Sequence, residues 1–115
     1  MTQVFGIKNC DTMKKACAWL DQHGIQYEFI DYKKSGVVAG QIQLWCSLSD
    51  WKILVNQRGT TWKKIPDLEK NPLDETRAKQ LMITYPSLIK RPIVLHKGKM
   101  IIGFNEDLFE NFFKE

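Results

Sequence analysis

Residues 4–32 read VFGIKNCDTMKKACAWLDQHGIQYEFIDY, and this stretch decides which fold we expect. The apolar run over 4–7 predicts a first strand. Between residues 11 and 23, apolar side chains recur every three or four positions, as they do along one face of a helix. Residues 26–32 are apolar or aromatic on both sides of a strand, so we interpret them as a strand in a sheet covered on both faces. This strand–helix–strand order predicts a parallel βαβ unit.

Downstream of this unit, the sequence predicts a helical segment and then a second group of strands. The spacing of apolar residues and the turn residues between them predict two short helices after Val38, a polar loop over 56–61, a helix over 74–85, a hairpin with strands at 92–95 and 100–102, and a helix over 105–113. All pieces fit one α/β fold, a four-stranded mixed sheet with flanking helices. We therefore predict a single domain over residues 1–115, with a helical insertion at about 36–85.

The composition is that of an ordinary globular chain and excludes several classes of protein. Of 115 residues, 43% are hydrophobic, and 17 basic residues against 13 acidic residues leave a net charge of +4. This mild excess fits a site that handles anions, but it lacks a dense basic stripe, so we expect no direct nucleic-acid partner. No apolar run approaches the ~18 residues of a membrane span and no leader precedes the first strand, so we expect no membrane association.

The cysteines and histidines indicate free thiols and no metal. Three cysteines at irregular spacing do not form the even-numbered framework of a disulfide-rich secreted protein. We therefore expect a cytoplasmic location, where thiols stay reduced. His23 and His96 have no Cys or His neighbour at the spacing of metal ligands, so we predict no metal site.

Cys10 is the residue most suited to chemistry, because it lies in the turn between the first predicted strand and the first predicted helix. A thiolate at a helix N-terminus is stabilised by unpaired backbone N–H groups and by the positive end of the helix dipole. Lys8 and Lys14 favour the same anion, although Asp11 opposes it, so we expect the pKa of this thiol to lie below ~8.5. The alternative is a buried structural cysteine, which is common in protein cores.

The other two cysteines are poorer candidates. Cys17 lies further along the same helix by a rise of about 10.5 Å, whereas a disulfide needs Cα atoms within ~7 Å. We expect Cys17 to pack in the core and Cys46 to be a core or half-buried thiol, although a long-range disulfide between Cys10 and Cys46 stays open. Met13 occupies the third position after Cys10, so the chain has no Cys-x-x-Cys pair. An external thiol such as glutathione must then complete any redox cycle.

Two arginines are candidates for binding an anion beside this cysteine. Arg58 lies in the predicted polar loop, and Arg91 directly precedes Pro92 at the start of a predicted strand. The planar guanidinium group suits carboxylates and oxyanions, which it binds through two parallel hydrogen bonds. The alternative for each is a solvated surface arginine. Whether Pro92 is cis stays open on this reasoning, because few X–Pro bonds in folded proteins are cis.

Three separated motifs, in order and across nearly the whole chain, resemble one family. GIKNCDT at 6–12, RGTTW at 58–62 and PSLIKRPI at 86–93 resemble the glutaredoxin-like arsenate reductases of the ArsC/Spx group, in particular its YffB branch. The resemblance implies a thioredoxin-like fold with a helical insertion. It also implies that Cys10 is the nucleophile and that Pro92 is a cis-proline facing it. Arg58 and Arg91 match two of the three arginines that hold the oxyanion in arsenate reductases.

The chain departs from the patterns of two groups within this family. Arsenate reductases carry a histidine where this chain has Gly6, an arginine where it has Lys14, and a third oxyanion-holding arginine near Gly103. The site therefore offers less anion-binding charge than an arsenate reductase. The Spx regulators, which bind RNA polymerase, usually carry a Cys-x-x-Cys switch, and Met13 removes that switch here.

These observations lead to three hypotheses of function. The first is a glutathione-dependent thiol–disulfide oxidoreductase, monomeric and without a bound cofactor, in which Cys10 is the single catalytic cysteine, glutathione is the co-substrate, and a protein disulfide is a second candidate substrate. Its anion- or glutathione-binding residues are Lys8, Asn9, Thr12, Lys14, Arg58, Arg91 and Pro92.

The other two hypotheses use the same fold differently. The second is an arsenate reductase that binds an oxyanion at the same cysteine. The third is an Spx-like, non-enzymatic regulator that binds RNA polymerase through a hydrophobic patch in the tryptophan-rich insertion. Core packing is the simpler role for these tryptophans, Trp45, Trp51 and Trp62, because large exposed apolar patches are rare on monomers.

Overall fold

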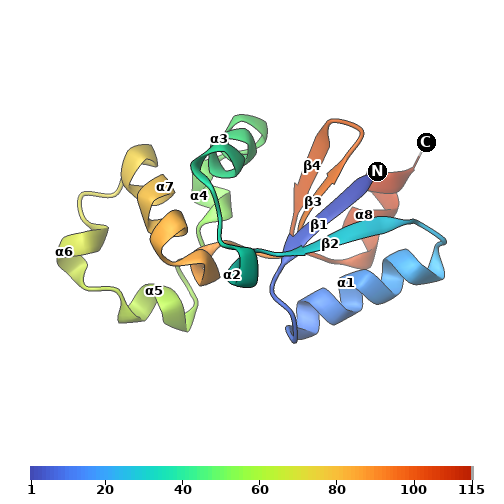
Figure 1. The fold of residues 1–115 in the computed structure, drawn as a ribbon, viewed down its shortest axis with the longest axis horizontal. Helices are drawn as coiled ribbons and strands as arrows, with labels where there is room; N and C mark the ends of the chain where they lie inside the picture. Colours follow the sequence, from blue (N-terminus) through green and yellow to red (C-terminus); the bar gives the residue numbers. More distant parts are fainter. Residues whose placement is uncertain (115) are drawn as a thin grey trace. The chain divides into compact units, whose positions relative to one another are not determined.

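The computed structural model describes residues 1–114. Its strands are β1 (Thr2–Gly6), β2 (Tyr27–Asp31), β3 (Ile93–His96) and β4 (Lys99–Ile102), and its helices are α1 (Asp11–Gln22), α2 (Tyr32–Ser35), α3 (Ala39–Leu48), α4 (Trp51–Leu54), α5 (Thr60–Lys64), α6 (Asp67–Lys70), α7 (Glu75–Thr84), the 3-10 turn η1 (Pro86–Leu88) and α8 (Glu106–Phe113) (Figure 1). Residues 1–31 and 91 onward form one compact unit, the sheet unit, and residues 32–90 form a second, the helical unit. The single domain with an insertion at about 36–85 stays a prediction.

β1 is an interior strand and determines the topology of the sheet unit. The strand order is β2-β1-β3-β4. β1 runs parallel to β2, with Val4 opposite Phe29, and antiparallel to β3, with Val4 opposite Val94. β4 runs antiparallel to β3 as the second strand of a hairpin. The predicted four-stranded mixed sheet, with its βαβ opening and its hairpin, is therefore confirmed.

The core of the sheet unit lies where α1 and α8 pack on one face of the sheet. Val4 and Val94 are register partners, so they point to the same face, and both are fully buried. Against them pack the apolar face of α1 and the Phe109 ring of α8. Trp19 of α1 meets Phe109 edge to face, with 5.4 Å between ring centroids. α8 follows Asn105 as predicted, and the Asn105 side chain accepts a 2.7 Å hydrogen bond from the first turn.

β2 has exposed side chains on both faces of the sheet, so the interpretation that it is covered on both faces is wrong. Among the described residues, only β1 pairs with it. Glu28 is exposed, and Phe29 retains 37% of its surface. Aromatic and apolar side chains favour fully covered and half-exposed strands alike, so the pattern over 26–32 does not separate the two.

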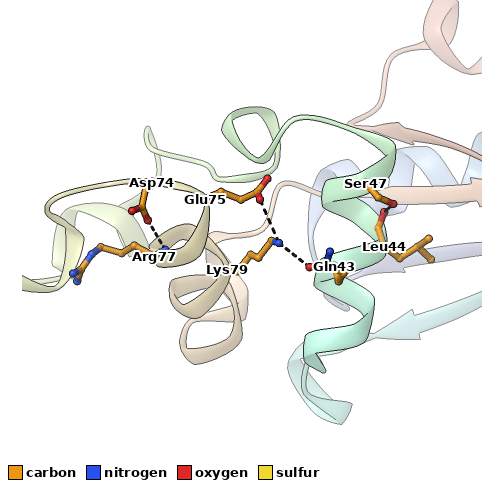
Figure 2. A network of polar contacts seen from close by, with 7 residues as sticks. All are labelled: Gln43, Leu44, Ser47, Asp74, Glu75, Arg77 and Lys79. Atoms are coloured by element: carbon orange, nitrogen blue, oxygen red, sulfur yellow. Dashed lines mark hydrogen bonds and ion pairs between the residues drawn. The ribbon is translucent and has the colours of Figure 1, made fainter.

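A polar network joins α3 to α7 in the helical unit (Figure 2). Lys79 on α7 donates to the side-chain oxygen of Gln43 on α3 at 2.7 Å and forms an ion pair with Glu75 at 3.4 Å. The Asp74 carboxylate accepts a 2.8 Å hydrogen bond from the Arg77 backbone N–H. Asp74 therefore caps α7 at its predicted start.

The helical unit differs from the sequence prediction between α4 and α7. The loop predicted over 56–61 is shorter than expected, because Thr60 begins α5. The apolar pattern does not predict α6, a single turn whose buried Lys70 donates to the Trp62 carbonyl at 3.1 Å. Trp45 is fully buried, whereas Trp51 and Trp62 are half-buried. Trp45 therefore has the simpler of its two expected roles, which is packing in the core.

Three further observations concern the described residues as a whole. Within residues 1–114, no helix has the length and apolar character needed to cross a bilayer. Cys10, Cys17 and Cys46 are free thiols and each is half-buried, so the disulfide that the sequence left open is not formed. The same range contains no group of three or more His, Cys, Asp or Glu side chains arranged to hold a metal ion.

Candidate thiol site

Three segments meet at the end of β1 and build the surroundings of Cys10. β1 ends at Gly6, which lies opposite Asp31, the last residue of β2. On its other side, β3 begins beside the same end of β1, so Arg91 just before β3 lies at this end of the sheet as well. The topology of the sheet unit therefore brings together residues that are far apart in the sequence.

The loop after β1 presents Cys10 as the N-cap residue of α1. Cys10 has extended backbone angles, φ −101° and ψ 132°, and its carbonyl accepts a 3.0 Å hydrogen bond from the Lys14 N–H. Asn9 has a left-handed φ of 68°, which asparagine adopts more readily than most residues. The Lys8 N–H donates to the Asp31 carboxylate at 3.3 Å and ties the loop to β2. These contacts hold the thiol at the N-terminus of α1.

The pKa of the Cys10 thiol lies below its ordinary value. Partial burial raises this pKa, but the polar N–H groups of Met13 and Thr12 and the guanidinium of Arg91 outweigh the effect of burial. The positive charge of Arg91 lowers the pKa further. The backbone donors are those expected at a helix N-terminus, and the charged partner comes from a distant part of the sequence. Cys10 is thus held closer to its reactive thiolate form.

Pro92 and Arg91 connect the helical unit's last residues to β3. The Arg91–Pro92 peptide bond is cis, as the family resemblance implies. Pro92 is buried and Arg91 is half-buried. A guanidinium group that already binds the Cys10 sulfur can also bind an anionic group attached to that sulfur, because it offers several donors in one plane.

The other predicted site residues fall into two groups. The loop and first turn that carry Cys10 also carry Lys8, Asn9, Thr12 and Lys14. Arg58 lies in the helical unit, exposed on the turn before α5, where its N–H donates to the Asn56 side chain at 3.1 Å. Its part in an anion site stays a prediction. Sequence reasoning missed Asp31, because its role depends on the register of β2 against β1.

Cys46 and Cys17 have surroundings unlike those of Cys10. Burial raises the pKa of Cys46, and nearby carboxylates act in the same direction, opposed by Lys79. Cys17 packs against the core beside Tyr27. Burial raises the pKa of Tyr27, and contacts with Cys17 and Asp21 raise it further. Cys10 is therefore the thiol that combines a helix N-terminus with a neighbouring guanidinium.

Arg91→Gln is expected to raise the pKa of Cys10 by about one unit, since it removes a charge-assisted hydrogen bond and an attractive charge from the thiolate. The rate of Cys10 alkylation by iodoacetamide at neutral pH then falls, and its midpoint moves to higher pH. Lys99→Gln is the matched control, because Lys99 begins β4 at the opposite end of the sheet. An unshifted midpoint in Arg91→Gln would show that the guanidinium does not act on the sulfur.

The comparisons with known proteins agree with this geometry. The model of the ArsC family matches residues 5–112, a range that contains Cys10, Arg58 and Arg91. The chain belongs to the ArsC family. An uncharacterised protein of Haemophilus influenzae is 43% identical over 98% of this chain and 99% of its own length. Among solved structures, a YffB protein is 40% identical, with a TM-score of 0.93 over 96% of this chain and 97% of that chain.

Two further relatives show the range of proteins that this ArsC family member resembles. The structure of an arsenate reductase (ArsC) related protein from Brucella melitensis is 42% identical, with a TM-score of 0.78 over 99% of this chain and 95% of that chain. The global transcriptional regulator Spx of Streptococcus pneumoniae is 27% identical over 97% of this chain and 85% of the regulator. The predicted ArsC/Spx family, its YffB branch and the thioredoxin-like fold are thereby confirmed.

Proposed function

We propose that this ArsC family protein is a glutathione-dependent thiol–disulfide oxidoreductase with Cys10 as its single catalytic cysteine. The observation that carries the proposal is the position of Cys10 as the N-cap of α1, where the Met13 and Thr12 N–H groups and the Arg91 guanidinium lower the pKa of its thiol. This environment stabilises a thiolate, and the thiolate is the form that attacks disulfides. Membership of the ArsC family supports thiol-based redox chemistry.

The reaction has two exchange steps. The Cys10 thiolate attacks the glutathione sulfur of a protein–glutathione mixed disulfide, so a Cys10–glutathione disulfide forms and the protein thiolate leaves and takes up a proton. The thiolate of a free glutathione then attacks the glutathione sulfur on Cys10, which gives oxidised glutathione and regenerates the Cys10 thiolate. Across the two steps, the protein sulfur of the mixed disulfide is reduced to a thiol, and the thiol of one free glutathione is oxidised as it joins the other glutathione in oxidised glutathione. The donors around Cys10 make it a good leaving group in the second step.

An external thiol is needed because Met13 stands where a resolving cysteine would close the cycle within the chain. Glutathione carries two carboxylates, and cationic and polar side chains of the chain suit them. We assign this binding to Lys8, Asn9, Thr12, Lys14, Arg58, Arg91 and Pro92. The proposed setting is the cytoplasm, where thiols stay reduced, and the proposed form is a monomer without a bound cofactor.

Arsenate reduction is a second candidate, favoured by the position of Arg91 beside Cys10. The same guanidinium that stabilises the thiolate suits an arsenate oxyanion bonded to the sulfur. Millimolar arsenate then protects Cys10 from alkylation, and absence of protection counts against this candidate. The likeness to Spx supports a third reading, a regulator of RNA polymerase. Capture of polymerase that survives Cys10→Ser would favour it.

The proposed function is tested by incubating the protein with oxidised glutathione from about pH 5 to pH 9. Intact mass and peptide mapping then locate the adduct. We expect one glutathione on Cys10, formed readily near neutral pH because the pKa of this thiol is lowered, and removed by reduced glutathione. If Cys10 reacts no faster than a cysteine in an unfolded peptide of the same sequence, the thiolate is not activated and the proposal fails.

A further inference from the structure

Gly6 lies against the side chain of Met13, and the space between them has no room for another atom. A Cβ built at Gly6 would be 2.5 Å from Met13 Cε, nearer still to Met13 Sδ, and 3.2 Å from Met13 Cγ. Carbon atoms that are not bonded to each other rest at about 3.5–4.0 Å, so any side chain at this position must displace Met13. Gly6 therefore provides a notch at the end of β1 that the thioether fills.

Met13 has little freedom to move away from this notch. Its side chain is 3% exposed and belongs to the core cluster with Val4, Ala16 and Leu20. Protein interiors are close-packed, so a displaced thioether shifts its own backbone or its neighbours. The backbone of Met13 matters at the site as well, because Met13 lies in the first turn of α1, the helix that Cys10 caps, and its N–H lowers the pKa of the thiol. Met13 therefore links the space beside Gly6, which its side chain fills, to the position of its own N–H group near the thiol.

We propose that Gly6 and Met13 are a matched positioning pair, in which the notch sets how closely the first turn of α1 approaches the sheet and thereby where its N–H groups meet Cys10. A Cβ at position 6 and the thioether of Met13 would occupy the same space, so Met13 can fill the notch only because residue 6 is glycine.

This inference rests on the proposed function for its importance, but its test does not use glutathione. The readout is the pH midpoint of Cys10 alkylation by iodoacetamide in the full-length protein, a property that a purely structural contact would leave unchanged in the folded state. Gly6→Ala is expected to raise the midpoint by about one unit, which leaves roughly tenfold less thiolate at neutral pH. Gly40→Ala is the matched control, because a Cβ there meets nothing within 4 Å.

The pair is tested as a pair by adding Met13→Ala to the first variant. Alanine at position 13 keeps the backbone donor and removes the atoms that a methyl group at position 6 would strike. The double variant is expected to return the midpoint toward the wild-type value. A folded Gly6→Ala protein with the wild-type midpoint overturns the proposal. A double variant also overturns it if its midpoint shift equals the shift of Gly6→Ala plus the shift of Met13→Ala measured separately.

Two outcomes keep this test separate from the proposed function. If Gly6→Ala does not fold, we expect the double variant to fold, as judged by thermal unfolding. A double variant that also fails to fold would show that Gly6 and Met13 are not sterically matched. If the midpoints behave as expected but the wild-type protein forms no glutathione adduct, the positioning pair stands and the proposed substrate is wrong.

Discussion

Cys10→Ser is expected to abolish adduct formation and turnover with glutathione completely, whereas Cys17→Ser and Cys46→Ser retain both. A serine hydroxyl does not ionise near neutral pH and does not attack disulfides, so the helix N-terminus and Arg91 have no thiolate left to stabilise. The measurement is the rate at which reduced glutathione releases the thiol of a glutathione-modified peptide, followed for all three variants at one protein concentration.

The two control cysteines make this test specific. Cys46 is shifted by burial toward the thiol form, and the half-buried Cys17 packs beside Tyr27 against the core, so neither is set up to attack. Loss of turnover in Cys46→Ser would contradict the one-thiol mechanism. The pH dependence gives a second check: because the pKa of Cys10 is lowered, the pH midpoint of its reaction with oxidised glutathione lies below that of an ordinary cysteine.

Phe109→Ala is expected to cost about 3–5 kcal/mol of the free energy of unfolding, which is large against the roughly 5–15 kcal/mol that stabilises a typical domain. Phe109 is fully buried. Its ring lies 5.4 Å from Trp19 and 4.7 Å from Phe104, in edge-to-face geometry. Alanine removes these contacts and leaves a cavity between α8 and α1, the helix that carries Cys10.

Urea denaturation followed by tryptophan fluorescence measures this loss. Phe112→Ala is the matched control, because Phe112 is the same residue type on the same helix but is only half-buried. Its substitution should cost clearly less, about 1–2 kcal/mol, in proportion to the smaller apolar area removed from the core. Equal costs for the two variants would mean that α8 is not anchored through Phe109.

The parts of the fold that the sequence predicts are those encoded by local signals. Asp74 and Asn105 cap α7 and α8 where expected, because an N-cap depends on a few neighbouring residues. The hairpin turn at Lys97 and Gly98 has positive φ at both residues, as a two-residue hairpin with a type I′ turn requires. What the sequence does not determine is how far the rest of the molecule covers each face of a strand, and the prediction that β2 is covered on both faces is therefore wrong.

The candidate site likewise has parts that local sequence signals predict and parts that depend on long-range contacts. Cys10 and its backbone donors could be predicted, because a strand-to-helix turn is visible in the pattern around it. The sequence does not show which cation lies near the sulfur. Arg91 is placed there because β3 pairs with β1, which is a long-range contact. The contact of Gly6 with Met13 depends on how one side chain packs between helix and sheet, which no periodicity reports.

The order of the sheet also separates its strands in time during synthesis. β1 and β2 are complete by residue 31, but the partner on the other side of β1 begins at Ile93, after the whole helical unit. At about 5–20 residues per second, a ribosome needs about 3–12 s to make the segment between them. During that interval the apolar face of α1 lacks both β3 and Phe109. The apolar face of α1 in the nascent chain therefore stays uncovered by these partners until the last strands and α8 emerge.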